Sequence, residues 1–98
     1  MSRIPASELY EFRNRISIER LIALYLHWPW KRREGIFRFL CPVCNEFHTA
    51  TNPRTNLGRC FRCQRNFNPI DFVMVVQKCD FLEAVAYLEP YLRAASSP

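Results

Sequence analysis

Apolar residues in the first third of the chain recur at helical spacing, which predicts two helices. A short helix is expected from Pro5 to about Arg13, with Ser7 as its N-cap. A second helix is expected to begin at Ser17 and to end near His27, which we interpret as a C-terminal cap. Its apolar positions follow the i, i+3, i+4, i+7 pattern of one buried face: Ile18, Leu21, Ile22 and Tyr25.

The pattern changes to short strands in the middle of the chain. Residues 28–35 are predicted to form a loop or an irregular edge, because Pro29 disfavours a helix at the preceding residue. Apolar and polar residues alternate from Ile36 to Leu40, which predicts a strand. Weaker strand patterns cover residues 47–51 and 57–61, joined by a turn-rich segment. These three strands are expected to form one antiparallel meander.

Helical signals return after residue 67. Asn68 is a good N-cap and Pro69 suits the first helical position, with a stripe that runs from Ile70 to Gln77. Asp80 and Glu83 have the spacing of a capping box, which predicts a final helix. Pro90 is expected to stop that helix near residue 89 and to leave residues 94–98 frayed. The predicted fold class is therefore α+β, with a small antiparallel sheet between N-terminal and C-terminal helices.

Length and composition indicate one folded domain. The chain has 98 residues, of which 49% are hydrophobic and 23% are charged, so we expect a single domain over residues 1–98 with an ordered core of about 4–92. No apolar run reaches the ~18 residues of a membrane span. Residues 1–5 contain no apolar signal segment, which favours the cytoplasm. Five cysteines in a reducing compartment indicate metal binding or reactivity rather than disulfides.

The positive charge is concentrated in one segment. The formal net charge is +5, and residues 31–65 contain eight basic and two acidic residues, a net +6. A basic middle between nearly neutral flanks is typical of a site for a polyanion. Four zinc-bound thiolates would add −2 and leave about +3 overall.

The cysteine spacing is the strongest motif in the chain. Cys41-Pro-Val-Cys44 and Cys60-Phe-Arg-Cys63 are two C-x-x-C pairs separated by 15 residues. Each pair offers two thiolates from one tight turn, and two such turns converge on a tetrahedral ion. The sequence therefore predicts one structural Zn²⁺ that is bound by all four cysteines. A site filled by four sulfurs has no open position for an activated water.

Other kinds of cysteine site fit this spacing less well. A thioredoxin-type redox pair leaves the second C-x-x-C unexplained. A rubredoxin-like iron site uses the same four sulfurs, but neither Cys44 nor Cys63 is followed by the glycine usual in such turns. His48 is a candidate replacement ligand within a strand-like segment. Cys79 lacks a partner and suits a small buried apolar position.

The order of these parts resembles the N-terminal zinc-binding domain of bacterial and phage DNA primases. The resemblance runs from Ile4 to about Leu88 and includes both C-x-x-C pairs, the Ile70-Asp-Phe-Val-Met74 segment and the Phe81-Leu-Glu-Ala-Val85 segment. It implies a zinc ribbon module that contacts the single-stranded DNA template during primer synthesis. A primase polymerase domain or a replicative helicase is the implied protein partner.

This chain departs from the family pattern at several positions. The family usually has His where this chain has Cys44, and either residue ligates zinc. Residues 45–50 differ from the family stretch that follows the first cysteine pair, and Gln64 and Asn66 replace glycines after the second pair. No pair of carboxylates is placed to hold Mg²⁺, so this segment alone is not expected to polymerise nucleotides. Both a fragment of a longer primase and a free-standing protein suit the sequence.

Aromatic and basic side chains are interleaved in the basic segment, as in proteins that bind single strands. One group of candidate contacts lies on the predicted sheet: Arg38, Arg54, Arg59, Phe61 and Arg62. A second group of candidate contacts lies just before the predicted sheet: Trp30, Lys31 and Arg32. Alternation along a strand does not tell which rings are buried.

We therefore predict a zinc ribbon module that binds single-stranded DNA template during DNA replication. One alternative is a protein-interaction adaptor, in which residues 69–92 dock a replication polymerase or helicase. A redox or electron-transfer protein is a second alternative, and metal analysis distinguishes it. Binding to DNA through arginines weakens steeply with salt, whereas an apolar docking face does not.

Overall fold

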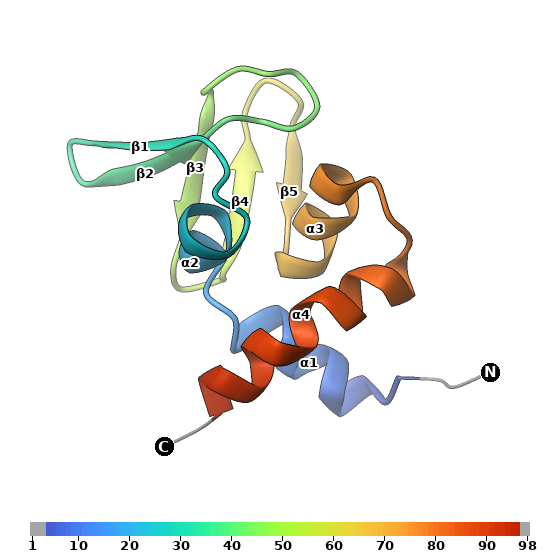
Figure 1. Ribbon diagram of the computed structural model, residues 1–98. Helices are drawn as coiled ribbons and strands as arrows, with labels where there is room; N and C mark the ends of the chain where they lie inside the picture. The colour runs from blue at the N-terminus through green and yellow to red at the C-terminus, as the bar shows by residue number, and fades with distance from the viewer. Residues whose placement is uncertain (1–3, 97–98) are drawn as a thin grey trace.

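Antiparallel strands lie above a layer of helices in the computed structural model, which describes residues 4–96 (Figure 1). The N-terminal elements are α1 (Ala6–Asn14), α2 (Ile18–Arg20) and the π-helix η1 (Leu21–Tyr25). The strands are β1 (Trp30–Arg33), β2 (Ile36–Phe39), β3 (Thr49–Asn52), β4 (Leu57–Cys60) and β5 (Arg65–Phe67). The C-terminal helices are α3 (Pro69–Gln77) and α4 (Phe81–Ser96). The predicted α+β class is confirmed.

The strands form two sheets instead of the one predicted meander. β1 pairs with β2 in a hairpin, and β3, β4 and β5 form a separate three-stranded antiparallel sheet. The prediction missed β5, because three residues are too short to show an alternating pattern. The prediction also placed β2 in the meander, but β2 pairs with β1. β2 is linked to β3 by the Thr49 side chain: the Phe39 N–H donates to Thr49 Oγ1, and this hydroxyl donates to the Phe39 carbonyl.

The prediction of a loop over residues 28–35 was wrong. Residues 30–33 form β1, and Trp30 lies opposite Phe39 while Arg33 lies opposite Ile36. The two connecting residues have positive φ, 53° at Glu34 and 78° at Gly35, as a type I′ turn requires. Every residue of β1 is exposed, so the strand shows no apolar alternation that would reveal it.

The N-terminal helices are close to expectation. The predicted cap Ser7 lies inside α1, because Pro5 is the last extended residue and the helix already begins at Ala6. Ser17 caps α2 as predicted, with its hydroxyl accepting from the Arg20 N–H at 3.3 Å. The helix then widens into η1 and ends at His27, whose φ of 50° lets the Trp28 N–H reach the Ile22 carbonyl at 2.8 Å. His27 is thus a C-terminal cap.

The predicted N-terminal caps of the two C-terminal helices are present. Asn68 and Asp71 cap α3 reciprocally, with side-chain to backbone distances of 2.8 and 3.2 Å. Asp80 and Glu83 do the same for α4, at 2.8 and 3.0 Å. Within residues 4–96, no helix combines the length and apolar composition that a membrane span requires.

Pro90 does not end α4, contrary to prediction. The helix continues to Ser96, and residues 97–98 lie outside the described part of the chain. Pro90 itself is exposed, while Leu88 and Leu92 on either side of it are buried. The ring of Tyr91 stacks on Tyr25 with centroids 4.0 Å apart. This packing holds both halves of the helix against the body and outweighs the roughly 3 kcal/mol cost of an interior proline.

Three phenylalanines join the sheets to α3. Phe39, Phe67 and Phe72 are fully buried and meet edge to face, with ring centroids 5.3 to 6.3 Å apart. Such edge contacts are favoured by the ring quadrupoles. The Phe39 ring also covers Gly58 in the central strand, where a side chain would leave it no room.

Asn56 fastens the far end of the three-stranded sheet to the N-terminal helices. Its backbone has a φ of 57°, and its side chain is buried. The amide nitrogen donates to the carbonyls of Arg13 and Ile16, both at 2.7 Å. The side-chain oxygen accepts from the Ile18 N–H at 2.8 Å. One side chain thus satisfies three backbone groups between α1 and α2.

Gly58→Ala is expected to destabilise the fold, because a methyl group there would lie 2.8 and 2.9 Å from two atoms of the Phe39 ring. Overpacking of this kind costs about 1–3 kcal/mol. Urea unfolding of the zinc-loaded protein measures the cost. Phe39→Leu should be less damaging in the Gly58→Ala background than alone, because the smaller side chain relieves the clash. An alanine variant as stable as the parent would contradict the close packing.

Candidate metal centre and nucleic-acid interface

The four cysteines converge at the end of the ribbon that lies away from α1 and α4. Cys41 and Cys44 lie in the turn after β2, and Cys60 and Cys63 lie at the end of β4 and in the turn before β5. Their four Sγ atoms all lie within 4.8 Å of one another. The Cys41–Cys63 and Cys44–Cys60 sulfur pairs are 3.8 and 3.7 Å apart. A tetrahedron of sulfurs about 2.3 Å from a zinc ion has edges of about 3.8 Å, so the cluster fits this metal.

The two turns have the same local geometry. The Val43 N–H donates to Cys41 Sγ and the Cys63 N–H donates to Cys60 Sγ, both at 3.4 Å. The residue after each second cysteine has positive φ, 60° at Asn45 and 53° at Gln64. Glycine is the residue that adopts this conformation without cost, and asparagine tolerates it better than glutamine. The left-handed turn therefore forms here without glycine.

Burial and hydrogen bonds within the cluster shift the pKa values of three of the thiols in different directions. Burial raises the pKa of the Cys41 thiol. Burial and the neighbouring sulfurs raise the pKa of Cys63 to about 12. Burial also opposes ionisation of Cys60, but the Cys63 N–H and the neighbouring thiols donate to its sulfur and lower its pKa to about 7. A divalent cation at the centre stabilises all the thiolates together.

The other two candidate ligands lie outside the cluster. His48 is exposed, and its backbone carbonyl accepts from the Phe61 N–H at 2.8 Å. Cys79 is partly buried and packs against the core between α3 and α4. Within residues 4–96, the only group of metal-ligating side chains of this kind is the four-cysteine cluster. Four sulfurs fill the coordination sphere of zinc, so the centre is structural.

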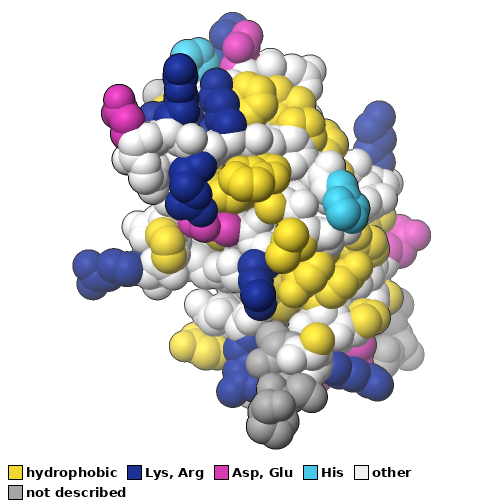
Figure 2. Space-filling model, turned by 60° about the vertical axis from the view of Figure 1, so that its left-hand side comes forward, with side chains coloured by type: hydrophobic (Ala, Val, Ile, Leu, Met, Phe, Trp, Pro, Cys, Tyr) yellow, Lys and Arg dark blue, Asp and Glu magenta, His cyan; other side chains and the backbone are white. Residues whose placement is uncertain are grey.

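The β1–β2 hairpin carries the second group of predicted DNA contacts, Trp30, Lys31 and Arg32. Figure 2 shows Lys and Arg side chains beside apolar ones on the face that is turned forward from the left-hand side of Figure 1. Trp30 is 46% exposed and stacks on Phe37, with ring centroids 4.9 Å apart. Arg32 pairs with Glu19 at 3.2 Å. Lys31 lies directly opposite Arg38 in the register. The Lys31 ammonium lies over the Phe47 ring, with Nζ 4.6 Å from the ring centre.

The first group of predicted contacts is spread over the three-stranded sheet, the second cysteine turn and β2. Phe61 is 54% exposed, and the Arg59 guanidinium lies 6.0 Å from the centre of its ring. Arg62 is exposed and pairs with Glu46 at 3.8 Å. Arg54 lies in the β3–β4 connection, at the opposite end of the sheet from the turn that holds Cys60 and Cys63. Arg38 is partly buried and donates to the Thr49 carbonyl at 2.8 Å, so it is less available than the sequence indicates.

A hollow of about 260 Å³ lies on the outer face of the three-stranded sheet, beside Phe61. Register places Ala50, Arg59 and Asn66 in one row across its floor. Arg59 donates to Asn66 Oδ1 at 3.1 Å, which leaves the Asn66 amide nitrogen to donate elsewhere. Nothing in the sequence pattern marks Asn66 as a contact, because the register of β5 alone places it beside Arg59.

Comparison with known proteins gives two findings. The CHC2 zinc finger family, the zinc ribbon of DnaG, matches residues 4–96. The chain is also 30% identical over 92 residues to a DNA primase from Mycobacterium leprae (strain TN). That alignment covers 90% of this chain and 14% of the primase, so the chain spans only a small part of its relative. The predicted resemblance is confirmed, and with it the prediction of one zinc ion.

Removal of zinc is expected to unfold the ribbon, because binding at a structural site of this kind contributes on the order of 10 kcal/mol. Cys60→Ser should lose the metal and the near-UV circular dichroism of the folded chain. Cys79→Ser is the matched control and should retain one zinc ion per chain. A chelated sample with unchanged circular dichroism would contradict a structural role for the centre.

Gln64→Gly is expected to stabilise the zinc-loaded protein by about 1 kcal/mol, because glycine removes the cost of the left-handed conformation and the exposed side chain loses no contact. Asn45→Gly is the control and should change stability less. Thermal unfolding at fixed zinc concentration measures both. Equal effects at the two positions would show that backbone strain does not distinguish the two turns.

Proposed function

The chain belongs to the CHC2 zinc finger family and is a primase-type zinc-binding module, and from this we propose that it binds the single-stranded DNA template during primer synthesis. The site that supports this proposal best is the hollow on the outer face of β3, β4 and β5. Its volume of about 260 Å³ is large enough for one unstacked base. Phe61 at its rim offers a ring for stacking, as single-strand binders do.

The polar groups of the hollow favour a base edge that accepts hydrogen bonds. Arg59 and the Asn66 amide nitrogen are hydrogen-bond donors. The Asn66 side-chain oxygen already accepts from Arg59, which leaves the amide nitrogen as the group that Asn66 offers to a base. Guanine O6 and N7, and the carbonyl oxygens of pyrimidines, are acceptors of this kind. The exposed cations of the hairpin and of the second cysteine turn supply contacts to phosphates. The surface thus combines stacking, base-edge donors and positive charge.

The remaining parts of the proposal concern context. We propose residues 1–98 as one domain that acts together with a primase polymerase domain or a replicative helicase, in the cytoplasm where template DNA is copied. An adaptor role is the second candidate. Exposed apolar side chains outside the basic segment favour it: Tyr10, Leu24 and Leu82.

Two neighbouring residues provide a sharp test. Arg62→Ala should lower the magnitude of the log K against log salt slope by about 0.7, the value for one phosphate contact on a single strand. Phe61→Ala should weaken binding by about 1–3 kcal/mol with the slope nearly unchanged, because stacking releases few counterions. Fluorescence anisotropy with labelled oligonucleotides at several salt concentrations measures both effects.

Leu82→Ala is the matched control, since Leu82 is 48% exposed on α4 and lies outside the basic segment. It should bind single strands like the parent. If the Arg62 and Phe61 variants also bind like the parent at low salt, template binding by this face is wrong. Loss of binding to a helicase or polymerase domain in the Leu82 variant alone would favour the adaptor.

A further inference from the structure

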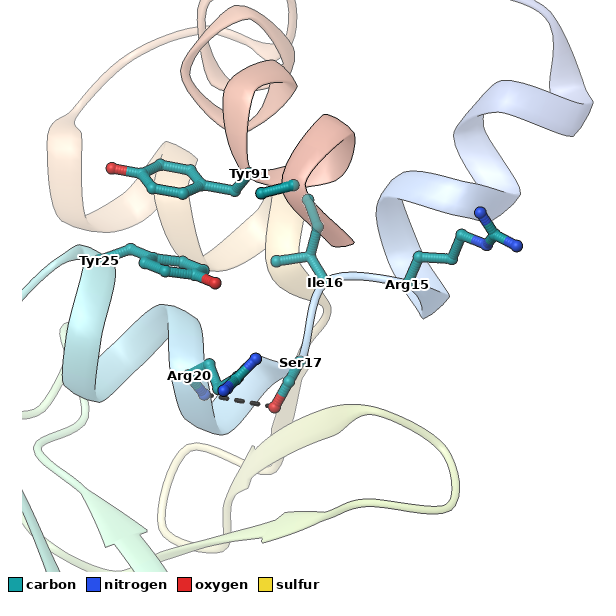
Figure 3. Close-up of a pocket in the computed structure, with 7 residues that line it drawn as sticks. Arg15, Ile16, Ser17, Arg20, Tyr25 and Tyr91 are labelled. Atoms are coloured by element: carbon teal, nitrogen blue, oxygen red, sulfur yellow. Dashed lines mark hydrogen bonds between the residues drawn. The ribbon is translucent and has the colours of Figure 1, made fainter. Parts of the chain in front are cut away.

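A second pocket lies on the helical side of the molecule, away from the cysteine turns (Figure 3). It is enclosed by the α1–α2 connection, by η1 and by the last turns of α4, and its volume is about 130 Å³. The lining residues are Arg15, Ile16, Ser17, Arg20, Tyr25, Tyr91 and Ala94. None of these residues belongs to the metal centre or to the sheet surface.

The π-helix explains why Arg20 and Tyr25 face the same pocket. In an α-helix, residue i+4 lies above residue i, whereas hydrogen bonding in a π-helix connects residues five apart. The Leu26 N–H accordingly donates to the Leu21 carbonyl at 2.9 Å. This wider turn brings Tyr25 above Arg20, where Figure 3 shows the tyrosine ring over the arginine side chain. π-turns of this kind are frequent at functional sites.

The Tyr25 ring is held in position from its other side. It stacks on Tyr91 with centroids 4.0 Å apart and an angle of 15° between the planes. Tyr87 donates from its hydroxyl to the Tyr25 carbonyl at 3.3 Å. Figure 3 shows the Tyr25 hydroxyl at the end of the ring nearest Ser17 and Arg20. The ring stack therefore holds the position of the hydroxyl oxygen at the pocket.

Three hydrogen-bond donors meet at the pocket. The Arg20 guanidinium has no ion-pair partner among residues 4–96. Ser17 Oγ accepts from the Arg20 backbone N–H at 3.3 Å, so its proton is available to a ligand. The Tyr25 hydroxyl is the third donor. All three groups offer protons to one small volume.

The charges around the pocket are positive. Among residues 4–96, no carboxylate lines it. Arg15 adds a second cation, although its side chain points away from the tyrosines in Figure 3 and pairs with Glu11 at 3.8 Å. Glu19, next to Arg20 in sequence, is engaged elsewhere: it accepts from Arg32 at 3.2 Å and from Thr51 at 2.7 Å. Glu19 thus pairs with Arg32 and Thr51 and not with Arg20.

We propose that this pocket binds a single phosphate group. The guanidinium provides the charge, and the serine and tyrosine hydroxyls donate to the remaining oxygens, as is usual for bound phosphates. A volume of about 130 Å³ holds one such group but not a whole nucleotide. The phosphate of a free nucleotide and a phosphodiester of a nucleic-acid strand share this chemistry. The site does not depend on base binding at the three-stranded sheet.

NMR spectroscopy of the zinc-loaded protein tests the proposal with inorganic phosphate as the probe. The Arg20 Nε–H signal and the backbone amides of Ser17 and Tyr25 should shift on titration. Arg20→Gln should weaken binding by about tenfold or more, as loss of a charge-assisted hydrogen bond predicts. Tyr25→Phe should weaken it less while keeping the ring stack. Arg93→Gln is the control, because Arg93 pairs with Glu89 outside the pocket.

Two further arms identify the source of the phosphate. Thymidine monophosphate supplies a phosphomonoester, and an oligothymidylate without terminal phosphates supplies phosphodiesters only. Shifts at Arg20 with one probe and not with the other assign the natural ligand class. Absence of shifts at Ser17, Arg20 and Tyr25 with all three probes overturns the proposal, as does phosphate binding of unchanged affinity in Arg20→Gln. If the three-stranded sheet has no affinity for single strands, phosphate should still shift the signals of Ser17, Arg20 and Tyr25.

Discussion

The fold depends on the meeting of four thiols within 4.8 Å at one end of a small ribbon. Four thiolates this close repel one another, and burial adds to the cost, so the arrangement requires a cation. The cation in turn joins three segments at that end: the chain after β2, the end of β4 and the turn before β5. A chain of 98 residues has a limited apolar core, which makes this link decisive.

The opposite end of the three-stranded sheet is fixed by hydrogen bonds instead. Asn56 binds three backbone groups of the α1–α2 connection, and the same connection contributes Ser17 to the phosphate pocket. Between the metal and this asparagine, the Phe39 ring lies over Gly58 and meets Phe67 and Phe72. The sheet is thus held at both ends and packed in the middle, so its outer face keeps one shape.

Local signals were readable from the sequence, and features that need tertiary contacts were not. The capping residues Asn68 and Asp80 act within one turn, and the cysteine spacing encodes its own geometry, so helices α3 and α4 and the metal centre were predictable. The continuation of α4 through Pro90 rests on the stack between Tyr91 and Tyr25, residues 66 positions apart in the chain. β1 is exposed throughout and β5 has three residues, so neither has a hydrophobic pattern. The hollow at Asn66 depends on β5 and was hidden for the same reason.

A closed four-sulfur centre has no chemistry of its own, so function must arise from the surfaces that it orients. Phe61 and Arg62 lie between the two zinc ligands of the second cysteine turn, and the Phe61 N–H is tied to the His48 carbonyl at 2.8 Å. Their backbone therefore has little freedom once the metal is bound. Ordering a ring before it stacks on a base reduces the entropy lost on binding. The metal that stabilises the ribbon would therefore also order the proposed recognition surface, because Phe61 and Arg62 lie between two of its ligands, Cys60 and Cys63. Folding and the proposed affinity for single strands would then depend on the same turn.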